Sequence, residues 1–172
     1  SVLAVDKNGN PLGNAITRSD NRAKKEAAAL KSSALGKTIY TATGTPLHPM
    51  SPLMKIAWIK NKDKERFKQT SKFLSIKSYI IKQLTDEYLI DYSIASATGL
   101  LNIHKIKWDT DALKFAGITP AMLPDLVPVF TPLGKLKKAY QSSLGLSADT
   151  KIIVGSSDGC MAILGDGVKG EG

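Results

Sequence analysis

The segment from Thr150 to Gly167 reads TKIIVGSSDGCMAILGDG, and it decides the fold class expected of this chain. Its apolar run, residues 152–154, predicts a short buried strand, and Gly155 breaks that strand. The apolar residues after Asp158 are typical of a helix. Asp158 is therefore expected just beyond the carboxyl end of a strand, where the chain turns into a helix. Open α/β sheets bind ligands and carry out chemistry at that end.

Two roles are open to Asp158 on its position alone. Its carboxylate can accept a proton from a substrate hydroxyl. It can equally cap the following helix by accepting hydrogen bonds from the free amides of the first turn. Cys160 follows on the apolar side of the same helix, so we expect a small buried side chain there rather than a nucleophile.

The length and composition of the chain restrict the classes of protein to which it can belong. The chain has 172 residues, long enough for one domain with a core, and no apolar run approaches the roughly 20 residues that span a membrane. The single cysteine excludes an internal disulfide framework and favours a reducing, cytoplasmic location. The two histidines, His48 and His104, have no zinc-site spacing with it.

The net charge of +9 is the unusual feature of the composition, and residues 55–82 carry nine basic residues against two acidic ones. Such a balance raises nucleic-acid binding as a hypothesis. The lysines of this region, however, alternate with apolar residues at helical spacing and are typical of solvated helix faces. No interleaved aromatic residues are present to stack bases, so we expect no specific nucleic-acid partner.

Along the chain, the pattern predicts a hairpin, several helices, and then the strand and helix described above. This order indicates an α/β fold with a helical insertion. The expected hairpin strands are residues 2–5 and 12–16, and a loop is expected over residues 36–50. Helices are expected over residues 21–32, 63–69, 109–116 and 134–143, the first of them capped by Ser19-Asp20. Further helices are expected to begin at Ser51-Pro52 and after Thr119-Pro120, and another to place Phe73, Ile76, Ile80 and Leu84 on its buried face.

Four separated blocks resemble the FGGY family of carbohydrate kinases, and most closely its gluconate kinase branch. Residues 20–22 resemble the end of the family's W-x-D-x-R segment, although Arg18 stands at the tryptophan position. The other three blocks are TGTPLHPMSPL at 43–53, DYSIASATGL at 91–100 and GSSDG at 155–159. The resemblance covers nearly the whole chain.

The resemblance implies an actin-like, ribonuclease H-like mixed sheet with flanking helices, incomplete at both ends. Residues 1–172 would be part of the family's N-terminal sugar-binding domain. The family's first phosphate loop would precede residue 1, and its nucleotide-binding C-terminal domain would follow residue 172. No complete nucleotide site is then expected in this chain, which alone would be inactive.

The implied activity is ATP-dependent phosphorylation of a sugar or sugar acid, with ATP and Mg²⁺ as cofactors and gluconate, converted to 6-phosphogluconate, as the substrate. D-xylulose is the alternative, because both branches share the four blocks. A non-catalytic basic module that binds an anionic partner is the alternative of another class. A homodimer is compatible with the resemblance.

Asp158 would be the catalytic base, and the metal would lie in its vicinity if it touches this chain at all. The substrate-binding residues implied by the family blocks are Asp91, Tyr92, Gly159, His48 and Met50. For Asp91 a helix cap, and for Tyr92 simple packing, are equally open. Ser93 and Ser96 are expected to bond the nearby backbone, and Asp20 and Arg22 to pair at the start of a helix.

Overall fold

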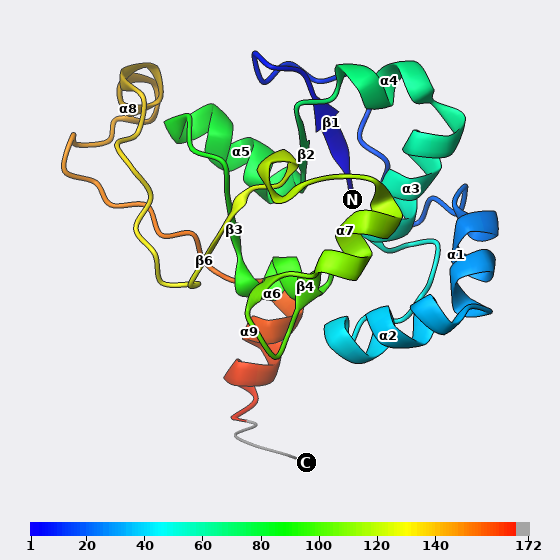
Figure 1. The fold of residues 1–172 in the computed structure, drawn as a ribbon. Coiled ribbons are helices and arrows are strands. Elements are labelled where there is room, and N and C mark those ends of the chain that lie inside the picture. The colour runs from blue at the N-terminus through cyan, green and yellow to red at the C-terminus, as the bar shows by residue number, and fades with distance from the viewer. Residues whose placement is uncertain (168–172) are drawn as a thin grey trace.

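The computed structural model describes residues 1–167, which form short strands and helices (Figure 1). The strands are β1 (Leu3–Val5), β2 (Lys72–Leu74), β3 (Leu89–Asp91), β4 (Leu101–Asn102), β5 (Lys107–Trp108) and β6 (Asp125–Val127). The helices are α1 (Lys24–Lys31), α2 (Ala34–Thr43), α3 (Pro52–Lys62), α4 (Lys64–Gln69), α5 (Ile76–Thr85), α6 (Tyr92–Ser96), α7 (Thr110–Ala116), a 3₁₀ turn (Pro120–Met122), α8 (Lys138–Leu144) and α9 (Asp158–Gly165).

Both parallel and antiparallel strand pairs are present. β1 pairs antiparallel with β2, β3 pairs parallel with β6, and β4 pairs antiparallel with β5. Within residues 1–167 these pairs form three separate two-stranded sheets rather than one continuous sheet. The predicted hairpin at the start is reduced to single bridges, from Val2 to Ile16 and from Val5 to Pro11. β1 takes its full ladder from β2 instead.

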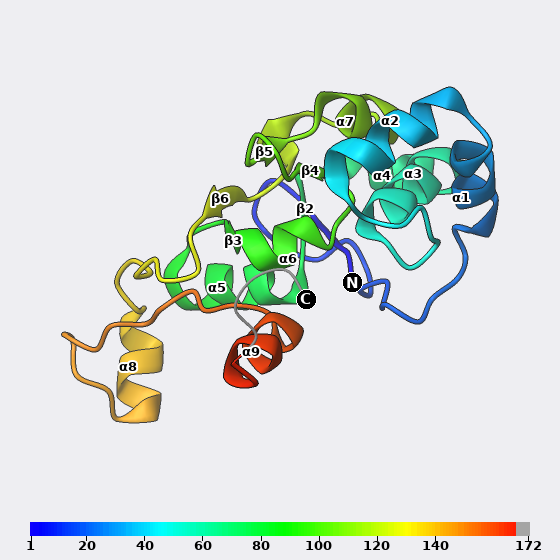
Figure 2. The same cartoon turned by 90° about the horizontal axis from the view of Figure 1, so that it is seen from below.

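Helices α1 to α4 lie in the chain between β1 and β2, two strands that pair with each other. They form the predicted helical insertion. In both views of the ribbon they gather on one side, and α8 lies far from them on the opposite side (Figures 1 and 2). Helices α1 to α4 therefore form one end of the molecule, and the later segment that contains α8 forms the opposite end.

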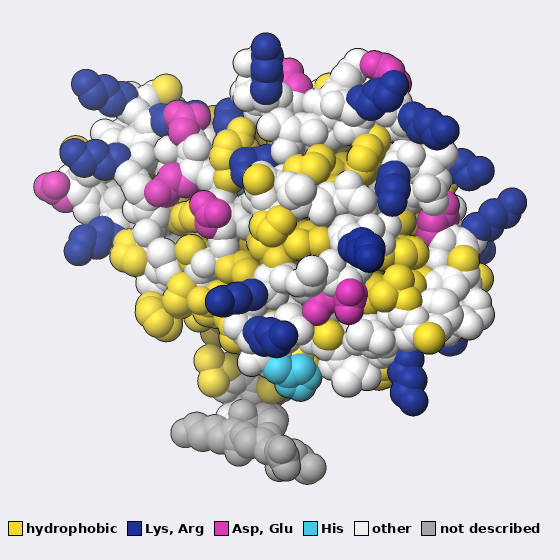
Figure 3. Space-filling model, in the orientation of Figure 1, with side chains coloured by type: hydrophobic (Ala, Val, Ile, Leu, Met, Phe, Trp, Pro, Cys, Tyr) yellow, Lys and Arg dark blue, Asp and Glu magenta, His cyan; other side chains and the backbone are white. Residues whose placement is uncertain are grey.

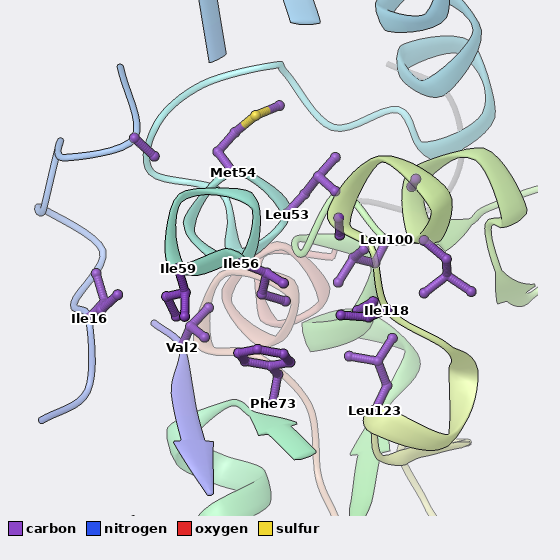
Figure 4. Packing of buried hydrophobic residues seen from close by; sticks show 14 of the residues in the cluster. Val2, Ile16, Leu53, Met54, Ile56, Ile59, Phe73, Leu100, Ile118 and Leu123 are labelled. Carbon is purple, nitrogen blue, oxygen red and sulfur yellow. The ribbon is translucent and has the colours of Figure 1, made fainter. Parts of the chain in front are cut away.

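The main core forms around α3, which is buried on nearly every side. Its apolar residues pack against Val2, Phe73 and Leu100 from three other parts of the chain (Figure 4). Six of its eleven residues are buried, Lys55 among them, and only its last turn reaches the surface. The helix begins at Ser51 and Pro52 as predicted, with the proline in its first turn. The side chain of Ser51, expected to cap the helix, makes no capping hydrogen bond.

The loop predicted over residues 36–50 is wrong for its first half, because α2 occupies Ala34–Thr43. We attribute the stability of α2 to tertiary packing rather than to local helix propensity, because Ile39 is fully buried in the main core. Ser33 caps its start by accepting a hydrogen bond from the Gly36 amide at 3.0 Å. The Pro- and Gly-rich remainder of that segment is a loop, as predicted.

The predicted α1 cap is also wrong. The helix begins at Lys24, and Ala23 precedes it without a side-chain cap. Asp20 is engaged elsewhere, because its carboxylate accepts hydrogen bonds from the backbone and side chain of Arg22. Asp63 and Asp109, in contrast, cap α4 and α7 as expected of acids before helices.

α5 exists as predicted but turns a different face to the core. Ile76 and Ile80 are 40% and 51% exposed, whereas Ser78 and Ile81 are buried, and Phe73 belongs to β2. Among residues 1–167, none of the helices has both the length and the apolar character that a membrane span requires.

Candidate active site

Asp158 is the first residue of α9, and the residue before it caps that helix. The Ser157 hydroxyl accepts a hydrogen bond from the Cys160 amide at 3.3 Å. Asp158 is exposed, and its Oδ1 accepts one hydrogen bond, from the Gly159 amide at 2.8 Å. The capping role is thus filled by Ser157, which leaves the Asp158 carboxylate available to a ligand.

The predicted strand ahead of Asp158 is reduced to one bridge, from Ile153 to Pro132, although Val154 is buried as expected. Gly155 then adopts a left-handed backbone with φ 70°, a conformation that glycine takes without strain. Cys160 is exposed rather than buried. Its prediction was wrong because no residue of α9 is buried within the described part of the chain.

An ion pair fixes the turn before Asp158. The Lys77 Nζ lies 2.6 Å from Oδ2 of Asp91 and donates to the Gly155 carbonyl at 2.9 Å. Asp91 is fully buried, while the Lys77 side chain is 26% exposed. An ammonium between a buried carboxylate and the loop carbonyl ties β3 to the loop that carries Asp158.

Asp91 is at the same time the cap of α6, since its Oδ1 accepts from the amides of Ser93 and Ile94 at 3.1 Å each. Burial alone raises the pKa of Asp91, but hydrogen bonds from Lys77, Ser93 and Ile94, with the Lys77 charge, outweigh it and hold this pKa below its ordinary value. The carboxylate is therefore ionised and fully engaged.

Ser93 links the two family blocks directly. Its hydroxyl donates to Oδ1 of Asp91. It also accepts from the Ser156 hydroxyl and the Ser157 amide, each at 2.9 Å. The expectation that Ser93 serves only its local backbone was therefore incomplete, because it reaches residues more than sixty positions away. Together Asp91, Lys77 and Ser93 hold residues 155–157 in place.

A cavity of about 780 Å³ opens beside this turn, within the roughly 300–1,000 Å³ typical of small-molecule sites. It brings together four of the predicted site residues: His48, Met50, Asp158 and Gly159. These come from the loop before α3 and from the start of α9, more than a hundred residues apart in the sequence. The cavity wall is mainly apolar.

Asp91 and Tyr92 do not line this cavity. Asp91 lies behind Lys77, which does line it. Tyr92 is the first residue of α6 and is half-buried. Contact of either residue with substrate stays a prediction, and what the structure shows for Asp91 is a capping and ion-pairing role.

His48 and Met50 are held by a tight local turn. The Nδ1 atom of His48 lies 3.2 Å from the Met50 amide, which donates to it. With Nδ1 engaged by this amide, Nε2 is the ring nitrogen left to contact a ligand. Both residues lie in the loop predicted over residues 36–50, and the structure brings that loop to the cavity.

A buried lysine joins two segments of the cavity wall and was missed by the sequence analysis. Lys55 is fully buried in α3, and its Nζ donates to the backbone carbonyls of Thr17 and Met50, to the latter at 3.0 Å. Burial lowers the pKa of Lys55, which the charge of Asp20 partly offsets. A lysine within the apolar run at 53–57 was the available signal.

Asp20 and Arg22 pair as expected, with 2.7 Å between Asp20 Oδ2 and the guanidinium. The Arg22 guanidinium also lies over the Trp58 ring, 4.8 Å from its centroid. Neither residue lines the cavity. The structure therefore shows a local structural role for this pair.

Metal-binding capacity is limited among residues 1–167, where no group of three or more His, Cys, Asp or Glu side chains could hold an ion. Asp158 is the one carboxylate among the cavity-lining residues. Mg²⁺ commonly keeps several waters and takes one or two protein carboxylates beside substrate phosphates. Asp158 would therefore be suited to bind Mg²⁺ as its one protein carboxylate ligand from this cavity.

Comparison with known proteins finds related sequences and related folds. The sequence profile described as the FGGY family of carbohydrate kinases, N-terminal domain, matches residues 1–165. A gluconokinase from Bacillus subtilis (strain 168) is 45% identical over 165 residues, which cover 96% of this chain and 32% of that protein.

Two solved structures show the fold. A gluconate kinase from Lactobacillus acidophilus is 37% identical with a TM-score of 0.90, over 94% of this chain and 33% of that one. A ligand-bound xylulose kinase from Lactobacillus acidophilus is 36% identical with a TM-score of 0.92. The match covers 95% of this chain and 34% of that chain. These similarities confirm the predicted actin-like α/β class. The chain spans about a third of the length of these relatives.

Proposed function

Because the chain belongs to the FGGY family of carbohydrate kinases, we propose that it forms part of the sugar-binding domain of a kinase that phosphorylates gluconate. The observation that supports this most is the convergence of His48, Met50, Asp158 and Gly159 on one cavity. Three separate family blocks thereby contribute either to the cavity wall or to the hydrogen-bond network behind it.

In this proposal Asp158 receives the proton of the substrate hydroxyl as that oxygen attacks the transferred phosphoryl group. ATP would supply that group, and Mg²⁺ would neutralise its charge. This chain would contribute by aligning the substrate hydroxyl with the Asp158 carboxylate, which must therefore be held in a fixed position. Lys77 and Ser93 provide this by fixing residues 155–157.

Gly159 fits the same role. A Cβ added at Gly159 would meet no heavy atom within 4 Å outside its two neighbouring residues and the backbone of its own helix. The residue therefore leaves room beside the Asp158 carboxylate for a reacting group. His48 would present Nε2–H to a substrate oxygen, and Met50 would contact the carbon chain.

The choice of gluconate rests on the 45% identical gluconokinase, since a xylulose kinase from Staphylococcus xylosus is 26% identical. D-xylulose is the second candidate because the xylulose kinase structure matches the fold equally well. A non-catalytic basic module has less support. On the face shown in Figure 3, Lys and Arg lie scattered with acidic side chains between them rather than in one stripe.

The test is a comparison of substrates. The full-length protein is assayed by coupled ADP release with gluconate and with D-xylulose, and kcat/KM is compared. The proposal expects a higher kcat/KM for gluconate. A higher kcat/KM for D-xylulose would make D-xylulose the substrate instead of gluconate. The absence of ADP release with any sugar or sugar acid would contradict the kinase assignment.

A further inference from the structure

We propose that Arg18 is the residue that recognises the carboxylate of a sugar-acid substrate. This inference rests on the proposed function and names the group that selects an acid over a neutral sugar. Asp158 is the one acid among the lining residues, and Arg18 and Lys77 are the two permanent cations.

The two cations differ in their availability. Lys77 is committed, because its ammonium lies 2.6 Å from the buried Asp91 carboxylate. The guanidinium of Arg18 has no ion pair or hydrogen bond with any residue in the range 1–167, and the side chain is exposed. Arg18 is thus the cation that can bind an added anion without breaking an existing pair.

Repulsion determines where a substrate carboxylate is placed. Asp158 must be ionised to accept a proton, and two like charges in one cavity repel each other. A sugar acid is therefore bound with its hydroxyl at Asp158 and its carboxylate away from it. A guanidinium offers the planar pair of donors that matches a carboxylate, and a neutral sugar has no group that needs it.

The backbone of Arg18 is anchored to the cavity wall. The Lys55 ammonium donates to the carbonyl of Thr17, next to Arg18, and to the carbonyl of Met50. One buried ammonium thus holds the segment that carries Arg18 beside the loop that carries His48. Arg18 and His48 thus line the cavity from two segments that this ammonium joins.

Arg22, the other arginine of this segment, has no such role. It is paired with Asp20 and lies over Trp58, outside the cavity. Specificity for an acid therefore depends on Arg18 and not on the general positive charge of the region. This difference makes the inference testable with single substitutions.

The experiment compares Arg18→Gln with wild type in the full-length enzyme, using gluconate and D-xylulose. Loss of a charge-assisted contact is expected to lower kcat/KM for gluconate about 10- to 100-fold and to leave D-xylulose within about 3-fold. Arg18→Lys keeps the charge without the paired donors, so an intermediate loss is expected. Lys25→Gln, an exposed lysine of α1 without a described partner, is the control for net charge.

The outcomes separate the two proposals. If wild type phosphorylates gluconate and Arg18→Gln does so equally well, or if Lys25→Gln loses as much, the inference about Arg18 is wrong and the proposed function stands. Equal losses on gluconate and D-xylulose would also overturn it, because Arg18 would then not read the carboxylate. If wild type accepts D-xylulose but not gluconate, the proposed substrate fails, and this inference fails with it.

Discussion

The substitution Asp91→Asn tests whether the buried ion pair holds the turn before Asp158. Asparagine keeps the size of aspartate and is an equally good helix cap. Its carbonyl oxygen can still accept from the amides of Ser93 and Ile94. Its amide nitrogen, or a neutral oxygen, then faces the Lys77 ammonium in place of a charge. The substitution therefore removes the ion pair and spares the cap.

The expected cost follows from burial. Removing one partner of a buried ion pair costs about 3–5 kcal/mol. Lys77 is 26% exposed and keeps its hydrogen bond to the Gly155 carbonyl, so the lower end of the range applies. We expect Asp91→Asn to reduce the free energy of unfolding by about 3 kcal/mol. The kcat of the full-length enzyme should also fall, because residues 155–157 lose part of their support.

A matched control exists at the surface. Asp86 and Lys137 form an ion pair of the same 2.6 Å length, but their side chains are 65% and 32% exposed. Exposed pairs contribute about 0–1 kcal/mol. Asp86 has φ 68°, a conformation that asparagine also tolerates. Asp86→Asn should therefore cost less than about 1 kcal/mol in the same urea unfolding experiment.

The pH dependence gives an independent check. The folded-state pKa of Asp91 is below its ordinary value of 3.8. Its contribution is then present above that ordinary value and disappears as the pH falls through the lower folded-state pKa. The stability difference between wild type and Asp91→Asn should be constant near neutral pH and shrink below pH 3.8. Equal costs for Asp91→Asn and Asp86→Asn at neutral pH would refute the reasoning.

Three further substitutions test local features by urea unfolding. Gly36→Ala places a methyl group 2.0 Å from the Leu30 carbonyl oxygen; a loss of at least about 2 kcal/mol is expected, and a loss below half of that would contradict the packing of α2. Ile106 has φ 51° although it is β-branched, so Ile106→Asn should stabilise the fold by about 1 kcal/mol, and destabilisation would argue against that backbone. The Ser51 hydroxyl is buried without a partner, so Ser51→Ala should be neutral or stabilising by up to about 1 kcal/mol, and a cost typical of a lost cap would show that it bonds after all.

Local signals in the sequence located many elements. The helices expected from Asp63 and from Asp109 are present, and α3 begins at Ser51-Pro52, because these features depend on a few neighbouring residues. The helix α2 was missed because its stability comes from burying Ile39, a contact that local propensity does not contain. α5 was predicted, but its buried face was not, since periodicity does not say which neighbours will cover it.

The site was predicted in part for the same reason. The resemblance selected Asp158, Gly159, His48 and Met50, and the structure brings them to one cavity. Lys77 was mistaken for a solvated lysine because its partner Asp91 lies fourteen residues away. A signal was available, since a cation in the first turn of a helix opposes the helix dipole. Such a local conflict often marks a functional position.

The most direct test of the central claim, that Asp158 is the base, is the kcat of the full-length enzyme with Asp158→Asn. Asparagine keeps the shape but cannot accept the proton, so kcat should fall about 10²- to 10⁴-fold while gluconate still binds. Asp166→Asn, at the other end of α9 and outside the cavity, should retain wild-type turnover. A kcat for Asp158→Asn within about 3-fold of wild type, far short of the loss expected of a general base, would contradict the account.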